Sequence, residues 1–68
     1  MNNVIVSHKK TESPTDVRSS RRIDVFADGT VHLSFDSAGA CFYTLLSLAE
    51  AAEFASLILD AVKENAHA

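Results

Sequence analysis

Cysteine, glycine and proline are scarce in this sequence of 68 residues, which contains one cysteine, two glycines, one proline and no tryptophan. The single Cys41 cannot form a disulfide within the chain, and His8, His32 and His67 lack the close spacing that makes zinc sites recognisable. A chain of this length buries only about 60% of the surface that its unfolded form exposes, so small domains usually need a disulfide, a metal or a partner chain. Because the sequence supplies neither a disulfide nor a metal site, it favours unusually good packing or oligomerisation, and no cofactor is expected.

Long apolar runs are also missing. The longest run, at residues 40–46, is interrupted by Thr44 and falls far short of the ~20 residues that a membrane helix needs. The N-terminal residues lack the basic start and the apolar segment of a signal peptide. A lone Cys41 within an apolar stretch is typical of a reducing compartment. We therefore expect a soluble, cytoplasmic protein.

No catalytic motif is present in the sequence. Catalysis needs a nucleophile or an acid–base group with an oriented partner in a cleft. His32 and Cys41 fall on segments that should be neighbours, but nothing in the sequence orients the histidine. The two glycines form no phosphate-binding motif. We expect that the protein is not an enzyme.

Charge is unevenly distributed along the chain, whose formal net charge is −3. Residues 1–22 contain five of the six basic residues and two acidic ones, whereas residues 23–68 contain one basic and seven acidic residues. We expect residues 1–20 to form a flexible basic arm, or a short strand followed by a mobile loop, because residues 7–20 contain a single aliphatic residue. The basic residues that could contact an anion or a nucleic acid are Lys9, Lys10, Arg18, Arg21 and Arg22.

Alternating apolar and polar residues on both sides of Gly29 predict a β-hairpin. A two-residue loop would place Leu33 opposite Asp24, whereas a three-residue loop at residues 27–29 places Leu33 opposite Ile23. The second register makes one side of the hairpin consistently apolar. It is therefore favoured, with Gly29 in the left-handed conformation.

The rest of the chain predicts a third strand and a helix. A turn-forming cluster at residues 36–40 and the β-forming residues 41–45 complete a β-meander. Ser47 and Glu50 then match a capping box, and residues 48–65 contain neither glycine nor proline. The expected fold class is α+β. A three-stranded antiparallel meander, or a four-stranded one if residues 4–6 form a short strand, is packed by one long C-terminal helix, and the domain spans residues 21–68.

The predicted helix has an unusually wide apolar arc. Projected at about 100° per residue, its polar residues gather in one sector of roughly 140°. A helix that packs on a single sheet needs an apolar stripe only somewhat wider than about 100°. The remaining arc is covered either by the N-terminal strand or loop of the same chain, or by a second copy in a two-fold homodimer. We favour the homodimer, because the chain has little else to cover this flank. The expected interface residues are Leu48, Ala52, Phe54, Ala55, Leu57, Leu59 and Ala61.

With catalysis and metal binding disfavoured, we expect the protein to act by binding another protein as an inhibitor or adaptor. Its acidic surface can engage a basic protein, including by occupying a nucleic-acid-binding groove. The expected partner-binding residues are Asp24, Phe26, Asp28, Asp36 and Tyr43. The alternation alone leaves open whether Phe42 or Tyr43 shares the face of Phe26. The alternative is a small homodimeric nucleic-acid-binding protein that uses the basic N-terminal arm. Against this alternative, the acidic body repels nucleic acid and no aromatic residue is interleaved in sequence with the basic ones.

In size, acidity and absence of catalytic groups, the chain resembles the small phage-encoded inhibitors of host or CRISPR machinery. The resemblance is one of type and covers no specific residues. It implies a protein that acts by occupying the surface of a partner.

Overall fold

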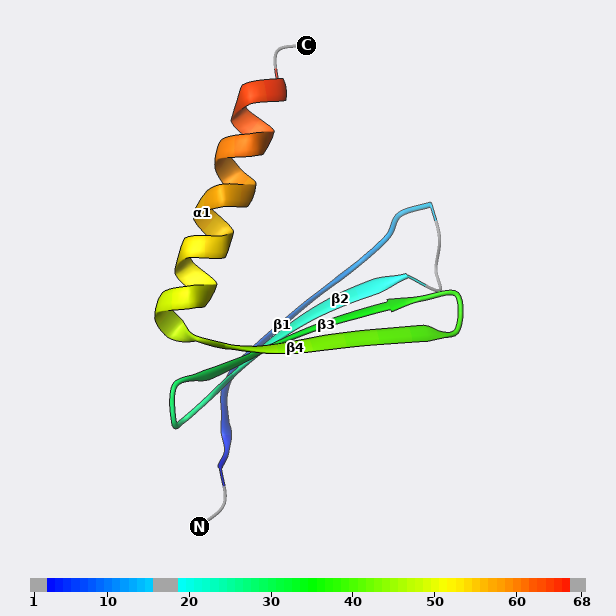
Figure 1. The fold of residues 1–68 in the computed structure, drawn as a ribbon. Helices are drawn as coiled ribbons and strands as arrows, with labels where there is room; N and C mark the ends of the chain where they lie inside the picture. The colour runs from blue at the N-terminus through cyan, green and yellow to red at the C-terminus, as the bar shows by residue number, and fades with distance from the viewer. Residues whose placement is uncertain (1–2, 16–18, 67–68) are drawn as a thin grey trace.

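The computed structural model describes residues 3–15 and 19–66. These residues form an antiparallel sheet with strand order β1-β2-β3-β4, followed by one helix, α1 (Figure 1). The elements are β1 (Ile5–Glu12), β2 (Ser20–Phe26), β3 (Thr30–Ser37), β4 (Ala40–Ser47) and α1 (Leu48–Asn65). The expected α+β fold is confirmed, and the sheet has four strands, which is the alternative that the sequence left open beside a three-stranded meander.

Strand β1 is longer than the three-residue apolar run that the sequence analysis singled out. It extends through polar residues to Glu12 and pairs with β2, so that Lys9 lies opposite Ile23 and Lys10 lies opposite Arg22. A register shift interrupts the pairing between Ile5 and Ser7. The basic residues of this segment therefore belong to a sheet strand.

The central hairpin of β2 and β3 has the register that places apolar residues on one side. Ile23 lies opposite Leu33, with a turn at residues 27–29. Gly29 has φ +88°, and its N–H donates to the Phe26 carbonyl at 2.9 Å. The predicted three-residue loop with a left-handed Gly29 is confirmed.

The turn between β3 and β4 places two consecutive residues in the left-handed region. Ala38 has φ +49° and Gly39 has φ +88°, while Ser37 lies opposite Ala40. Positive φ at both central residues is characteristic of a type I′ hairpin turn. Gly39 adopts this conformation without steric cost, but Ala38 carries a Cβ that disfavours it.

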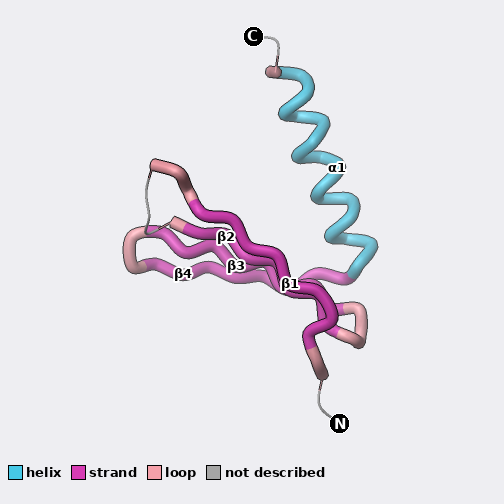
Figure 2. Tube along the Cα trace, turned by 180° about the vertical axis from the view of Figure 1, so that it is seen from behind, coloured by secondary structure: helices cyan, strands magenta, loops and turns pink. Residues whose placement is uncertain are grey.

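Helix α1 begins directly after β4. The Ser47 hydroxyl accepts from the Glu50 N–H at 3.1 Å, and the Glu50 carboxylate accepts from the Ser47 N–H at 2.9 Å. This is the predicted capping box, which satisfies backbone donors at the N-terminus of the helix. The helix rises from the end of β4 over one face of the sheet and approaches only β3 and β4 (Figures 1 and 2).

The hydrophobic core of a single chain is very small. Val31, with 3% of its surface exposed, is the one buried hydrophobic residue in the described part of the chain, and no residue of α1 is buried. The radius of gyration is 13.9 Å, whereas a compact chain of this length has a value of about 11 Å. The accessible surface is 5442 Å², against about 4,200 Å² for a compact monomer of the same mass. The isolated chain thus exposes about 1,200 Å² more than a compact monomer would.

Candidate partner-binding face

The strands present two chemically different faces because successive side chains of a strand point to opposite sides. One face lies under α1, and we call it the helix-side face. The other is turned away from the helix, and we call it the outer face. The paired residues of the helix-side face include Ile23, Val25, Val31, Leu33, Phe35 and Phe42. The corresponding residues of the outer face include His8, Lys10, Arg22, Asp24, Phe26, His32, Ser34, Asp36, Tyr43 and Leu45.

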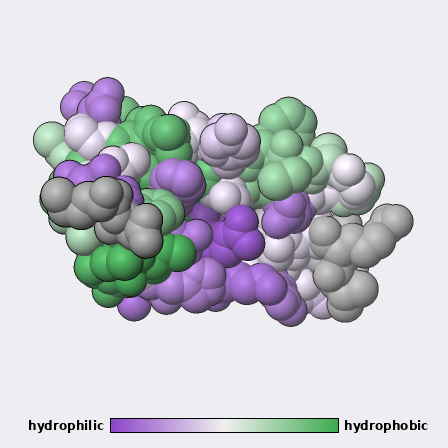
Figure 3. All heavy atoms as spheres, turned by 90° about the horizontal axis from the view of Figure 1, so that it is seen from below, coloured by the Kyte–Doolittle hydropathy of each residue, from purple (hydrophilic) through white to green (hydrophobic). Residues whose placement is uncertain are grey.

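An aromatic row crosses the outer face from β2 to β4. The ring centroids of Phe26 and His32 are 4.6 Å apart, and those of His32 and Tyr43 are 6.4 Å apart with planes inclined by 21°. Tyr43 is 68% exposed. The sequence left open whether Phe42 or Tyr43 joins Phe26, and the β3–β4 register selects Tyr43. Seen from below, this side of the molecule mixes polar and apolar side chains (Figure 3).

Asp24 is buried beneath the outer face and is held by two basic neighbours. The Nδ1 atom of His8 contacts its Oδ1 atom, and Nε of Arg22 lies 3.6 Å from Oδ2. Arg22 also donates from Nη2 to the Ser34 hydroxyl at 3.5 Å. Asp24 therefore organises the face, and its carboxylate is less available to a partner than that of an exposed residue. His8 could not be assigned to this face from the sequence, because its contact with Asp24 depends on the β1–β2 register.

Asp36 lies at the other end of β3, opposite Cys41. Its carboxylate accepts from the Ser20 hydroxyl at 3.5 Å. Hydrogen bonding to Asp36, followed by desolvation and the charge of this carboxylate, raises the pKa of the Cys41 thiol. A raised pKa disfavours the nucleophilic thiolate. His32 is four residues along β3 from Asp36, about 13 Å at strand spacing, so it is not placed to activate Cys41.

The other proposed partner-binding aspartate, Asp28, occupies the turn between β2 and β3. Its Oδ1 atom accepts from the Thr30 N–H at 2.8 Å, and hydrogen bonding to Thr30 is the main cause that lowers its pKa. Four of the five residues expected to bind a partner thus share the outer face, and Asp28 lies in the turn beside it.

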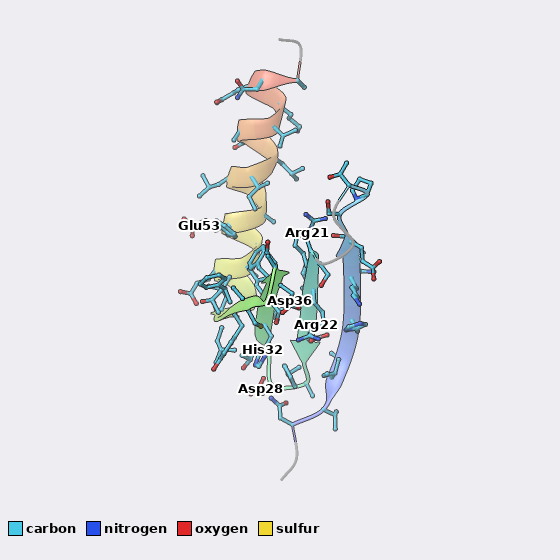
Figure 4. The ribbon with its side chains drawn as sticks, turned by 90° about the vertical axis from the view of Figure 1, so that its right-hand side faces the viewer. Arg21, Arg22, Asp28, His32, Asp36 and Glu53 are labelled. Carbon is cyan, nitrogen blue, oxygen red and sulfur yellow. The ribbon has the colours of Figure 1, made fainter. Side chains whose placement is uncertain are left out.

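The basic residues are divided between the two faces. Lys10 and Arg22 lie opposite each other on the outer face, whereas Lys9 and Arg21 belong to the helix-side face. Arg21 donates from Nε to the Thr11 hydroxyl at 3.0 Å. Figure 4 shows the two arginines on β2, with Glu53 of α1 pointing away from the sheet. Arg18, which the sequence analysis grouped with these residues, lies outside the described residues.

The aromatic residues and the basic residues are closer in space than the sequence indicated. Phe26, His32 and Tyr43 share the outer face with Lys10 and Arg22. Basic and aromatic residues that are not interleaved in the sequence thus share one face of the folded chain, because neighbouring strands bring together residues that are distant in sequence.

A groove of about 540 Å³ separates α1 from the helix-side face. Four of the expected dimer-interface residues line it: Leu48, Ala52, Phe54 and Ala55. The other three, Leu57, Leu59 and Ala61, are not among its lining residues and remain exposed. Both flanks of the helix are therefore open in the isolated chain.

No group of three or more potential metal-ligating residues occurs within residues 3–15 and 19–66. In the same described ranges, no helix has both the length and the apolar character needed to span a membrane. Comparison of the chain with protein-family models, curated proteins and solved structures finds no match.

Proposed function

We propose that this chain is a non-catalytic binding protein that forms a homodimer and holds a basic segment of another protein on its outer face. In this role it acts as an inhibitor or adaptor by occupying the surface of its partner. The helix and the helix-side face serve the second copy, while the outer face remains free for the partner.

The observation that carries the binding proposal is the composition of the outer face. Exposed Tyr43 ends an aromatic row, and Asp36 lies on the same face. An aromatic ring attracts the cation of a lysine or arginine, and a nearby carboxylate pairs with it. Lys10 lies 3.4 Å from Glu12 and Arg22 lies 3.6 Å from Asp24, so the charges within these two pairs largely balance, and Asp36 adds one further carboxylate to the face. This excess of one carboxylate favours a basic ligand over an acidic one.

The homodimer is supported by the surface that a single chain leaves exposed. The excess of about 1,200 Å² over a compact monomer exceeds the ~800 Å² that each partner buries in a standard protein interface. Much of it is apolar, because Leu57, Leu59 and Val62 of α1 are all more than half exposed. Apolar patches of this extent are unusual on monomeric proteins and mark interaction surfaces.

Fluorescence anisotropy with a labelled arginine-rich peptide tests the binding proposal. We expect the wild-type protein to bind the peptide and the Tyr43→Ala variant to bind it about tenfold more weakly, a loss of about 1.4 kcal/mol typical of an aromatic anchor. Asp36→Asn should also weaken binding. Glu53→Gln is the matched control, because it removes a carboxylate from the side of the helix that points away from the sheet. Absence of peptide binding, or an equal loss in Glu53→Gln, would contradict the proposal.

A second candidate function is the binding of single-stranded nucleic acid. It is favoured by the shared location of the aromatic row with Lys10 and Arg22, because bases stack on aromatic rings and phosphates pair with cations. Its test is anisotropy with a labelled oligothymidylate at low salt. Binding that is lost in Lys10→Gln and Arg22→Gln, in a protein that does not bind the peptide, would favour this candidate.

A further inference from the structure

The two edges of the sheet differ in how well they are protected from further pairing. Strand β1 carries charges at Lys9, Lys10 and Glu12, and its pairing is interrupted by a register shift near its start. Charged residues and irregularities of this kind are the usual protection of an edge strand. The β1 edge is therefore poorly suited to pairing with another strand.

Strand β4 has none of these protective features. Its eight residues include no charged residue and no proline, and its pairing with β3 runs without interruption from Ala40 to Ser47. Phe42, Tyr43 and Leu45 are all at least half exposed. Within the described residues, β4 pairs with β3 alone, so its second edge presents a row of unpaired backbone groups. A long, regular and apolar edge of this kind is a template for pairing with another strand.

A second copy of this chain is the occupant that the observations favour. An antiparallel edge can pair with its own symmetry mate around a two-fold axis, because both strands present the same pattern of donors and acceptors. The edge is also continuous with the apolar helix, since α1 begins at Leu48, immediately after β4 ends. Pairing around one two-fold axis can thus bury both the β4 edge and part of the exposed surface of α1.

We propose that two copies of the chain pair through their β4 strands, in antiparallel orientation, to form one continuous sheet of eight strands. This inference rests on the proposed homodimer and specifies how the second copy is bound. A two-fold axis perpendicular to the sheet places the outer faces of both copies on one side of the joined sheet and the helix-side faces on the other. Both helices then lie on one side of the joined sheet, where their exposed apolar flanks can pack.

The proposed pairing has a consequence for the outer face. The two aromatic rows end at Tyr43 on β4, so pairing of the β4 strands brings these ends together at the centre of the dimer. The row then runs from Phe26 of one copy to Phe26 of the other across six adjacent strands. At about 4.8 Å per strand, its length is roughly 24 Å. A single ligand segment could contact both copies.

Disulfide trapping in the full-length protein tests the β4 pairing. In a Cys41→Ser background, one cysteine is introduced at a time at Phe42, Tyr43, Thr44 or Leu45, and each variant is treated with a mild oxidant. In a symmetric antiparallel pair of β4 strands, a residue lies opposite the same residue of the other copy only where the two-fold axis passes. One position, or two adjacent positions, should therefore give a covalent dimer in high yield. Thr11→Cys on the β1 edge is the matched control and should remain monomeric on a non-reducing gel.

Sedimentation of the same variants without oxidant separates failure of the inference from failure of the proposed homodimer. If the variants sediment as dimers but no β4 position is trapped, or if Thr11→Cys is trapped instead, the β4 pairing is wrong and the homodimer stands. If the unmodified protein and the variants sediment as monomers, both are wrong. Trapping at a central β4 position in a protein that sediments as a dimer supports both.

Discussion

Asp24 on β2 and His8 on β1 contact each other through Oδ1 and Nδ1, and this contact joins the first strand to the buried centre of the outer face. Arg22 approaches the same carboxylate at 3.6 Å. Both contacts form in the register in which His8 lies opposite Asp24. The pair therefore links the two strands beneath the outer face.

Removal of the Asp24 carboxylate should destabilise the protein. The Asp24→Ala variant removes the carboxylate that His8 and Arg22 both contact, and the expected loss is about 1 to 3 kcal/mol of unfolding free energy. Urea unfolding at fixed protein concentration measures it. Asp60→Ala, on the exposed polar side of α1, should change the unfolding free energy by less than about 0.5 kcal/mol. Equal effects of the two substitutions would show that the Asp24 contacts contribute nothing specific.

The turn between β3 and β4 should be improved by substitution of Ala38. Its φ of +49° is disfavoured for alanine, whereas asparagine tolerates this region and Asn-Gly is the preferred type I′ pair. We expect Ala38→Asn to raise the unfolding free energy by about 0.5 to 1 kcal/mol, and Gly39→Ala to lower it by about 1 to 2 kcal/mol. Midpoints of urea unfolding give both values. A loss of stability in Ala38→Asn would contradict the turn geometry.

The capping box should make stability depend on pH. Hydrogen bonding to the Ser47 backbone N–H, and then to its side chain, lowers the pKa of Glu50. The pKa of Glu50 is lower in the folded state than in the unfolded state. The stabilisation by the capping box is therefore complete above the pKa of an unperturbed glutamate, about 4.3, and is lost as the pH falls through the folded-state pKa of Glu50. Glu50→Gln should therefore lose less stability than the wild type between about pH 5 and pH 3. Glu53 lies outside the capping box, so the stability of Glu53→Gln should follow the wild-type dependence on pH in this range. Identical pH dependence in all three proteins would contradict the role given to Glu50.

Charge on the exposed helix flank should weaken the proposed dimer. Leu59 is 57% exposed and is not among the residues that line the groove on its own sheet. Leu59→Glu would place an unpaired carboxylate in the proposed interface between copies. We expect the dissociation constant to rise at least tenfold, which corresponds to about 1.4 kcal/mol. Ser56→Glu, in the polar sector of the helix, is the control. An unchanged dissociation constant in Leu59→Glu would remove this flank from the interface.

The sequence predicted the parts of the fold that depend on local patterns. The register that pairs Ile23 with Leu33 followed from apolar alternation, and the helix start followed from the capping box at Ser47 and Glu50. The extent of β1 was not predictable in this way, because its polar residues carry no alternation and its order depends on backbone pairing with β2. The contact between His8 and Asp24 required the same non-local pairing.

Residues of the outer face were only partly predictable. Alternation within each strand placed Asp24, Phe26 and Asp36 on one side, but the choice of Tyr43 over Phe42 required the β3–β4 register. The position of α1 was not predictable from its amphipathic pattern either. The pattern indicated two apolar contacts, and in the single chain the helix leaves both flanks exposed.

The proposed homodimer requires that a second copy covers the helix, so that a single chain is not the complete folding unit. Sedimentation equilibrium of the full-length protein at micromolar concentration tests this requirement. We expect a mass twice that of the 7.3 kDa chain. A single species with the mass of one chain, stably folded at that concentration, would contradict it.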